Sequence, residues 1–119
     1  MVEKLLAAEL DLPYDDSMQD WAYEVAKSDD LENYLNHYNS LSDEDEKFVL
    51  MQLIIQAIND KKGLAELEFY WENVKGLLIK DFKIHQYTIF YWSVFHAENA
   101  NEEWVISPYM RNISKEISG

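Results

Sequence analysis

A chain of 119 residues can bury a hydrophobic core of its own, and the lack of cysteine excludes disulfides, thiolate metal sites and cysteine nucleophiles. The net charge of −13 is unevenly distributed, because residues 1–46 contain fourteen acids and two lysines, whereas residues 47–119 contain nine acids and eight bases. Such an acidic block repels nucleic acid and anionic membranes and attracts basic partners, although charge runs also serve solubility alone. The first residues lack a signal-peptide pattern, so we expect a cytoplasmic protein.

The acidic block predicts three short helices. Apolar residues at positions 2, 5 and 6 favour a helix that ends before Pro13, because the residue preceding proline avoids the helical conformation. The triplet Asp15-Asp16-Ser17 offers an N-cap for an amphipathic helix from Met18 to Val25. Ser28-Asp29-Asp30 offers a second cap, and the next apolar stripe repeats the same helical spacing. That stripe consists of Leu31, Tyr34, Leu35 and Tyr38.

The central helix of the fold is predicted at about residues 43–60. Nine of the eleven residues in 48–58, FVLMQLIIQAI, are apolar, and a helix apolar around most of its circumference is buried on several sides. Ser42 is the expected N-cap, and the four carboxylates from Asp43 to Glu46 occupy the first turn beside the positive end of the helix dipole. Lys61-Lys62-Gly63 is the expected stop. The segment is shorter than the roughly 20 residues that span a bilayer.

Two helices are predicted to follow. The first of them covers residues 67–78. Gly76 inside it lowers the stability of the helix by about 1 kcal/mol relative to alanine. We interpret this glycine as a point where another helix approaches closely. Asp81 is expected to cap a segment from Ile84 to Phe95, which is aromatic enough for a strand but has helical spacing and a helix length. One row with helical spacing holds Ile84, Thr88, Tyr91, Trp92 and Phe95, and a second holds Tyr87, Phe90 and Val94.

The C-terminal part predicts one more helix. Residues 97–106 form a polar connection in which Trp104, Val105 and Ile106 are expected to fold back onto the core. Ser107-Pro108 is a helix start, since proline is favoured at the first helical position. Short connections and scarce glycine and proline favour mostly antiparallel neighbours. We therefore predict a single all-α domain over residues 1–119, with six or seven short helices in a bundle or helical-hairpin array. Residues 1–46 are its acidic helical block and residues 47–119 its near-neutral core helices.

Little in the sequence indicates catalysis. His37, His85 and His96 have no metal-ligand spacing, and the acidic run at 43–46 lacks the alternating ligands and glycine of a calcium loop. No phosphate-binding loop can be built from three glycines. Asp81 and His85, four residues apart, are a possible acid–base pair, but a cap aspartate beside a first-turn histidine explains the same spacing. Arg111 is expected to bond a carboxylate or carbonyl of the core helices. We predict no enzymatic activity, no cofactor and no metal.

Four segments between residues 48 and 113 suggest a family: FVLMQLIIQAI, WENVKGLLIKD, HQYTIFYWS and EEWVISPYMRNI. They resemble small all-helical bacterial proteins that act as immunity proteins in toxin and contact-dependent growth inhibition systems. The resemblance implies that the chain neutralises a toxin domain by covering its active site or substrate channel. The acidic block agrees with a basic partner such as a nuclease, because complementary charge speeds capture.

The partner site is therefore predicted on the acidic block, with Tyr23 as an exposed aromatic anchor. Its predicted residues are Asp15, Asp16, Asp20, Tyr23, Glu24, Asp29, Asp30, Asp43, Glu44, Asp45 and Glu46. Two alternatives stay open. A helical adaptor would present an apolar groove to a partner helix, and a small hydrolase would present a concave pocket with converging titratable groups.

Overall fold

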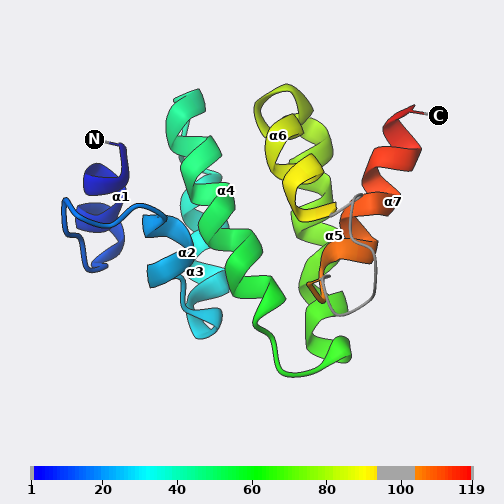
Figure 1. The fold of residues 1–119 in the computed structure, drawn as a ribbon, viewed down its shortest axis with the longest axis horizontal. Helices are drawn as coiled ribbons and strands as arrows, with labels where there is room; N and C mark the ends of the chain where they lie inside the picture. The colour runs from blue at the N-terminus through cyan, green and yellow to red at the C-terminus, as the bar shows by residue number, and fades with distance from the viewer. Residues whose placement is uncertain (1, 94–103, 119) are drawn as a thin grey trace. The chain divides into compact units, whose positions relative to one another are not determined.

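The computed structural model describes residues 2–93 and 104–118, which form seven α-helices, one 3₁₀ helix and no strand (Figure 1). The predicted all-α class is confirmed, including a helix rather than a strand at the aromatic segment. The elements are α1 (Val2–Leu10), α2 (Trp21–Val25), η1 (Ser28–Asp30), α3 (Leu31–Tyr38), α4 (Glu44–Asn59), α5 (Leu64–Lys80), α6 (Phe82–Ser93) and α7 (Ser107–Ser118). They cluster into two compact units, residues 1–62 and 63–119.

The first unit is organised around α4, which contacts α1, α2, η1 and α3. Seven residues of α4 from Leu50 to Ile58 are buried, whereas Gln52, Gln56 and Asn59 are partly exposed along one stripe, as predicted. The apolar stripe of α3 is buried at all four expected positions. A helix that is apolar on most sides can accept neighbours on several faces, which explains why α4 holds this unit together.

The ends of the helices in the first unit are set by specific hydrogen bonds. At the end of α1, Asp11 adopts a left-handed conformation with φ 55°, and the Leu12 N–H donates to the Ala7 carbonyl oxygen at 2.8 Å. This six-to-one bond is the mark of a Schellman motif, in which the residue after the left-handed position makes an apolar contact. Leu12 is indeed buried. The helix thus ends before Pro13, as predicted.

Two of the predicted caps are wrong, and a third makes no side-chain cap bond. Asp15 does not cap α2, because its Oδ1 accepts from the backbone N–H and hydroxyl of Ser17 in a local turn, and α2 begins only at Trp21. Ser42 does not cap α4; the side chain of Asp43, one residue later, accepts from the Glu46 N–H at 2.9 Å. Asp30, the last residue of the third predicted cap, occupies the N-cap position of α3 but makes no side-chain cap bond, and the hydroxyl of Ser28 donates to the Ala57 carbonyl oxygen near the end of α4.

Both glycines of the α5 region differ from their predicted roles. Gly63 is not the stop of α4, which ends at Asn59; it is the N-cap residue of α5, with φ −140° and ψ 151°. Gly76 is exposed inside α5, and a Cβ placed there would meet nothing within 4 Å. No close helix approach therefore explains this glycine, and that prediction is wrong.

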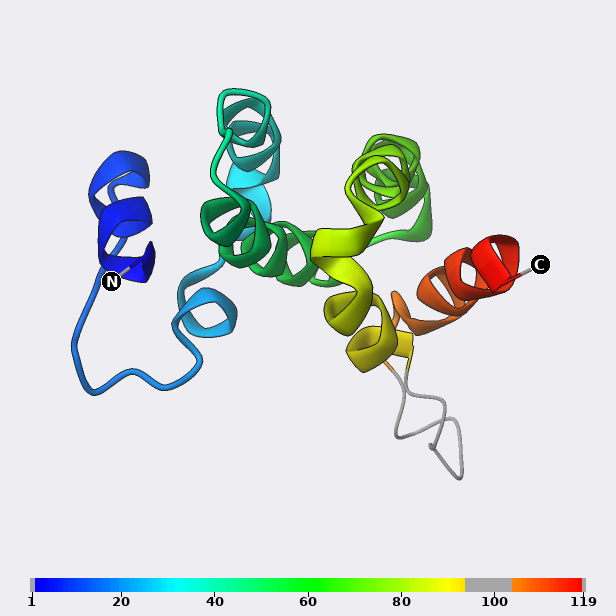
Figure 2. The ribbon, with the colours of Figure 1, turned by 90° about the horizontal axis from the view of Figure 1, so that it is seen from above.

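In the second unit, α6 packs against both α5 and α7 (Figure 2). The two rows with helical spacing are buried only in part: Thr88 and Trp92 are buried, but Tyr87, Phe90 and Tyr91 are 65%, 53% and 42% exposed. The residues that α6 buries are His85, Thr88, Ile89, Trp92 and Ser93. The Ser93 hydroxyl on this face donates to the Ile89 carbonyl oxygen at 2.7 Å, whereas the buried Thr88 Oγ1 has no hydrogen-bond partner among the described residues. Val94, Phe95 and His96 lie outside the described residues.

The last helix is joined to the rest of its unit by polar and aromatic contacts. Arg111 Nε donates to the Ser93 carbonyl oxygen at 2.8 Å, which confirms the predicted bond to a core-helix carbonyl. Ile106 is buried and Trp104 packs on Trp92 with ring centroids 4.5 Å apart, as expected, but Val105 is exposed. The Ser107 Oγ accepts a hydrogen bond from the backbone N–H of Trp104, three residues earlier in the chain.

Candidate functional site

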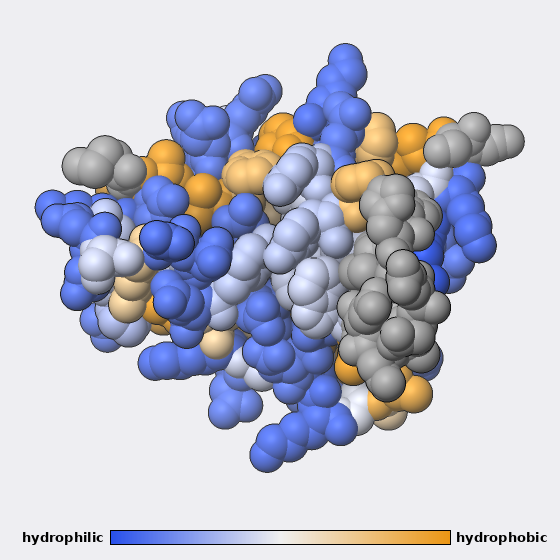
Figure 3. Space-filling view, viewed as in Figure 1, coloured by the Kyte–Doolittle hydropathy of each residue, from blue (hydrophilic) through white to orange (hydrophobic). Residues whose placement is uncertain are grey.

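The carboxylates of the predicted site lie on the surface of the first unit. Eight of the ten are exposed, and Asp30 and Glu46 are partly exposed. We call the eight exposed residues the acidic surface: Asp15, Asp16, Asp20, Glu24, Asp29, Asp43, Glu44 and Asp45. On the face seen in Figure 3, hydrophilic residues cover most of the area around α1, α2 and α3. The expected exposure is thus found, although exposure alone does not make a binding site.

Two of these carboxylates accept hydrogen bonds from neutral donors. Asp15 accepts from Ser17, and Asp43 accepts from a backbone N–H of α4. The two hydrogen bonds from Ser17 lower the pKa of Asp15 below its ordinary value, the backbone bond more than the hydroxyl bond. Asp15 therefore stays ionised in mildly acidic solution.

The proposed aromatic anchor of the site is less accessible than predicted. Tyr23 is half-buried, because it lies on the flank of the short helix α2 between the buried Ala22 and the exposed Glu24. A second tyrosine of this unit has a structural role: Tyr34 is buried, and its hydroxyl accepts from the Lys27 N–H at 3.1 Å. Burial raises the pKa of Tyr34 above its ordinary value.

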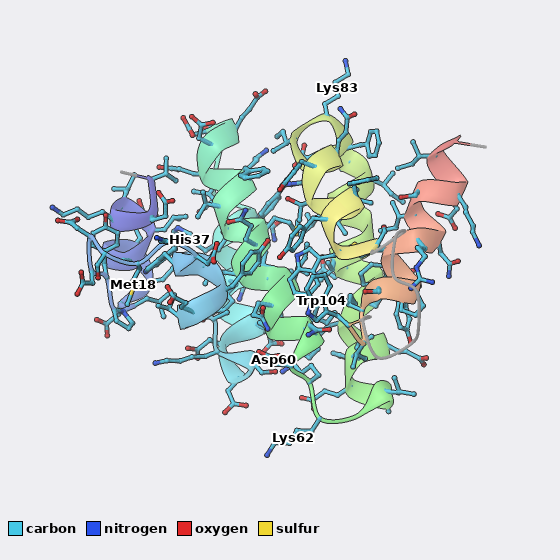
Figure 4. The ribbon with its side chains drawn as sticks, viewed as in Figure 1. Met18, His37, Asp60, Lys62, Lys83 and Trp104 are labelled. Carbon is cyan, nitrogen blue, oxygen red and sulfur yellow. The ribbon has the colours of Figure 1, made fainter. Side chains whose placement is uncertain are left out.

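A pocket that the sequence analysis did not predict lies between the end of α1 and the outward side of α3. Its volume is about 480 Å³. The lining residues are Glu9, Leu10, Asp11, Asn33, Asn36, His37 and Ser40. Across it, His37 Nε2 and Glu9 Oε2 are 2.7 Å apart, and Figure 4 labels His37 at this place. A pattern in the sequence could have indicated this pocket, because residues 33, 36, 37 and 40 form a polar row with helical spacing.

The pair that sequence spacing offered for catalysis is not in this pocket. His85 is fully buried in α6. Asp81 is partly exposed where α5 meets α6, and its carbonyl oxygen accepts from the N–H groups of Ile84 and His85. The histidine side chain is therefore not accessible to a substrate in this conformation. Within the described residues, no group of three or more His, Asp or Glu side chains could hold a metal ion.

Comparison with known proteins adds no relative. No family model, no curated protein and no solved structure matches the chain. None of the described helices combines the length and the apolar character that crossing a membrane requires. The function must therefore be inferred from the surface and the pocket described above.

Proposed function

We propose that this protein is an immunity protein that binds a basic bacterial toxin domain, of nuclease type, and blocks its active site. The partner would dock on the acidic surface of the first unit. The observation that supports this proposal is the concentration of exposed carboxylates there, two of which, Asp15 and Asp43, accept hydrogen bonds from neutral groups. Residues 1–62 contain fifteen acids and five lysines.

Electrostatic attraction would act mainly on the rate of capture. A cluster of like charges raises the local concentration of an oppositely charged partner and orients it before contact, which increases the association rate. Solvent-exposed charges are screened by salt, with a Debye length of about 10 Å at 0.1 M and about 3 Å at 1 M. The association rate should therefore fall steeply with added salt, while the dissociation rate changes less.

A helical adaptor is the second candidate, and the exposed rings of α6 favour it. Tyr87, Phe90 and Tyr91 lie at i, i+3 and i+4 and form one outward stripe, and Tyr87 stacks on Tyr91 with centroids 6.3 Å apart. Aromatic residues on a helix face are common anchors at protein interfaces. Replacing all three with serine would abolish partner binding by an adaptor and would leave the capture of a basic partner on the acidic surface unchanged.

The hydrolase alternative has less support. The pocket at Glu9 and His37 contains titratable groups, but the Ser40 hydroxyl donates to the His37 carbonyl oxygen at 2.7 Å. That bond does not activate the hydroxyl, since a nucleophile needs a base at its proton. The absence of enzymatic activity remains a prediction, to be tested by turnover assays against nucleic acid, peptide and ester substrates.

The test uses the basic toxin domain that this proposal expects to be encoded beside the chain. The variant carries Glu44→Lys and Asp45→Lys and retains Asp43, because Asp43 caps α4 and its loss would destabilise the helix. The matched control carries Glu66→Lys and Glu72→Lys on α5. Both pairs are exposed, change the net charge equally and include first-turn positions.

The two variants should behave differently. We expect the α4 variant to associate at least tenfold more slowly at low salt and to protect co-expressing cells poorly, whereas the α5 variant should resemble the original chain. Thermal unfolding of both variants shows whether folding is intact. An association rate that is independent of salt and equal in both variants would contradict the proposal and assign the charge to solubility.

A further inference from the structure

The pocket beside His37 has a composition that favours a positively charged ligand. Two carboxylates, Glu9 and Asp11, lie on its α1 side, and the polar row of α3 supplies two amide side chains, a histidine and a hydroxyl. No lysine or arginine lines it. Because an amide oxygen and a carboxylate oxygen both accept hydrogen bonds, most of the lining can serve a ligand that is rich in N–H donors.

The backbone adds to this preference. The pocket lies at the C-terminal end of α1, where Glu9 and Leu10 are the last helical residues and Asp11 follows. Asn36 and His37 belong to the last turn of α3, and Ser40 follows its end. The C-terminal end of a helix carries a partial negative charge, so two such ends at one pocket attract a cation.

We propose that this pocket binds the guanidinium group of an arginine side chain presented by the basic partner. This inference rests on the proposed function and names a contact within it. Guanidinium is planar and has five N–H donors, which suits two carboxylates and neighbouring amide oxygens better than the compact ammonium of lysine. A carboxylate has two oxygens, so Glu9 can hold His37 and the guanidinium together. Leu10 lines the same pocket and offers an apolar neighbour to the aliphatic stem.

The probe is Nα-acetyl-arginine amide, and its control is Nα-acetyl-citrulline amide, which has nearly the same shape without the charge. Each is titrated into the ¹⁵N-labelled full chain and followed by two-dimensional NMR. We expect saturable shifts in the backbone signals of residues 9–11 and 33–40 with the arginine compound and none with the citrulline compound. Non-saturating shifts spread equally over Asp15, Asp16 and residues 43–46 would mean non-specific ion pairing and would overturn the proposal.

Two substitutions locate the contact. Glu9→Gln and Asp11→Asn each remove one charge while keeping a polar side chain, and asparagine tolerates the left-handed backbone of residue 11. The matched control is Glu66→Gln with Glu72→Gln on α5, which removes two exposed carboxylates that belong neither to the pocket nor to the acidic surface. The double variant at 9 and 11 should weaken arginine binding about tenfold or more, because bonds to charged groups are the strong ones. The control should change it less than twofold, and equal weakening by both would refute the site.

The arginine titration and the measurement of toxin association can fail separately. If the chain captures the toxin domain but the pocket does not bind the arginine compound, the pocket is not the anchor and the proposed function stands. If the pocket binds arginine specifically but no basic domain is captured, the inferred site is real and its assignment to a toxin partner is wrong.

Discussion

Replacing Gly76 with alanine should stabilise the protein. Gly76 lies inside α5 and is exposed, and an added Cβ would meet nothing within 4 Å. The substitution therefore creates no clash and only removes the backbone freedom that glycine has in the unfolded chain. The helix propensities of the two residues differ by about 0.8–1.0 kcal/mol. In a chain of this size, that gain raises the melting temperature by roughly 3–6 °C.

Gly63 provides a matched control with the opposite sign. A Cβ at Gly63 would also meet nothing within 4 Å, yet this residue is the N-cap of α5 and has an extended backbone. Glycine is preferred over alanine at the N-cap. We therefore expect Gly63→Ala to destabilise the protein by roughly 0.5 kcal/mol. Equal space for a methyl group thus leads to opposite effects, because only one of the two positions is helical.

Urea denaturation followed by far-UV circular dichroism and tryptophan fluorescence measures both variants. The midpoint of unfolding should rise for Gly76→Ala and fall for Gly63→Ala, with unchanged slopes. Two probes are needed, since the two compact units can unfold in separate transitions. A lower midpoint for Gly76→Ala would refute the exposed helical placement of residue 76. A shift in the same direction for both variants would refute the assignment of Gly63 to the helix start.

Three further predictions concern the first unit. Ile55→Ala should cost about 2–5 kcal/mol in urea denaturation, because Ile55 is fully buried in α4 and its loss leaves a cavity. Asp43→Ala should cost about 1 kcal/mol and Ser42→Ala almost nothing, because the structure places the cap bond on Asp43. The lowered pKa of Asp15 contributes stability above the ordinary pKa of 3.8, and this contribution is lost as the pH falls through the lower, folded-state pKa. Asp15→Asn should flatten that part of the stability profile between pH 5 and about 2.

Each of these has a result that would contradict it. A loss below about 0.5 kcal/mol at Ile55 would place α4 outside the core. Equal losses at positions 42 and 43 would mean that both side chains share the cap. An unchanged acid profile in Asp15→Asn would show that the turn at Ser17 is not formed in solution.

The helices were predictable where one apolar stripe stands alone between polar residues. In α3 the stripe from Leu31 to Tyr38 leaves only one side for the core, so spacing alone selects the buried face. In α6 the spacing is ambiguous, because apolar and aromatic residues occur on most sides of the helix. The actual buried face includes His85, Thr88 and Ser93, whose polar groups made it look exposed. Hydrogen bonds such as that from Ser93 to the Ile89 carbonyl oxygen are not visible in a hydrophobic pattern.

The site was predicted in part for a similar reason. Exposure of the carboxylates follows from composition and from their positions at helix starts, and these are local properties. The pocket depends on a contact between Glu9 and His37, 28 residues apart, which no local pattern contains. The choice between Ser42 and Asp43 as the cap was also beyond the sequence, because both side chains can accept the bond and the backbone decides between them.

The aromatic stripe of α6 has a consequence for handling the protein in the laboratory. At neutral pH a net charge of −13 keeps copies of the chain apart, but the isoelectric point is near 4.4. Close to that pH the repulsion disappears, whereas the rings of Tyr87, Phe90 and Tyr91 remain in contact with water. Self-association in acidic buffers should therefore begin through α6. Crystals grown near the isoelectric point should contain lattice contacts on these rings, and polar replacements there should keep concentrated samples clear.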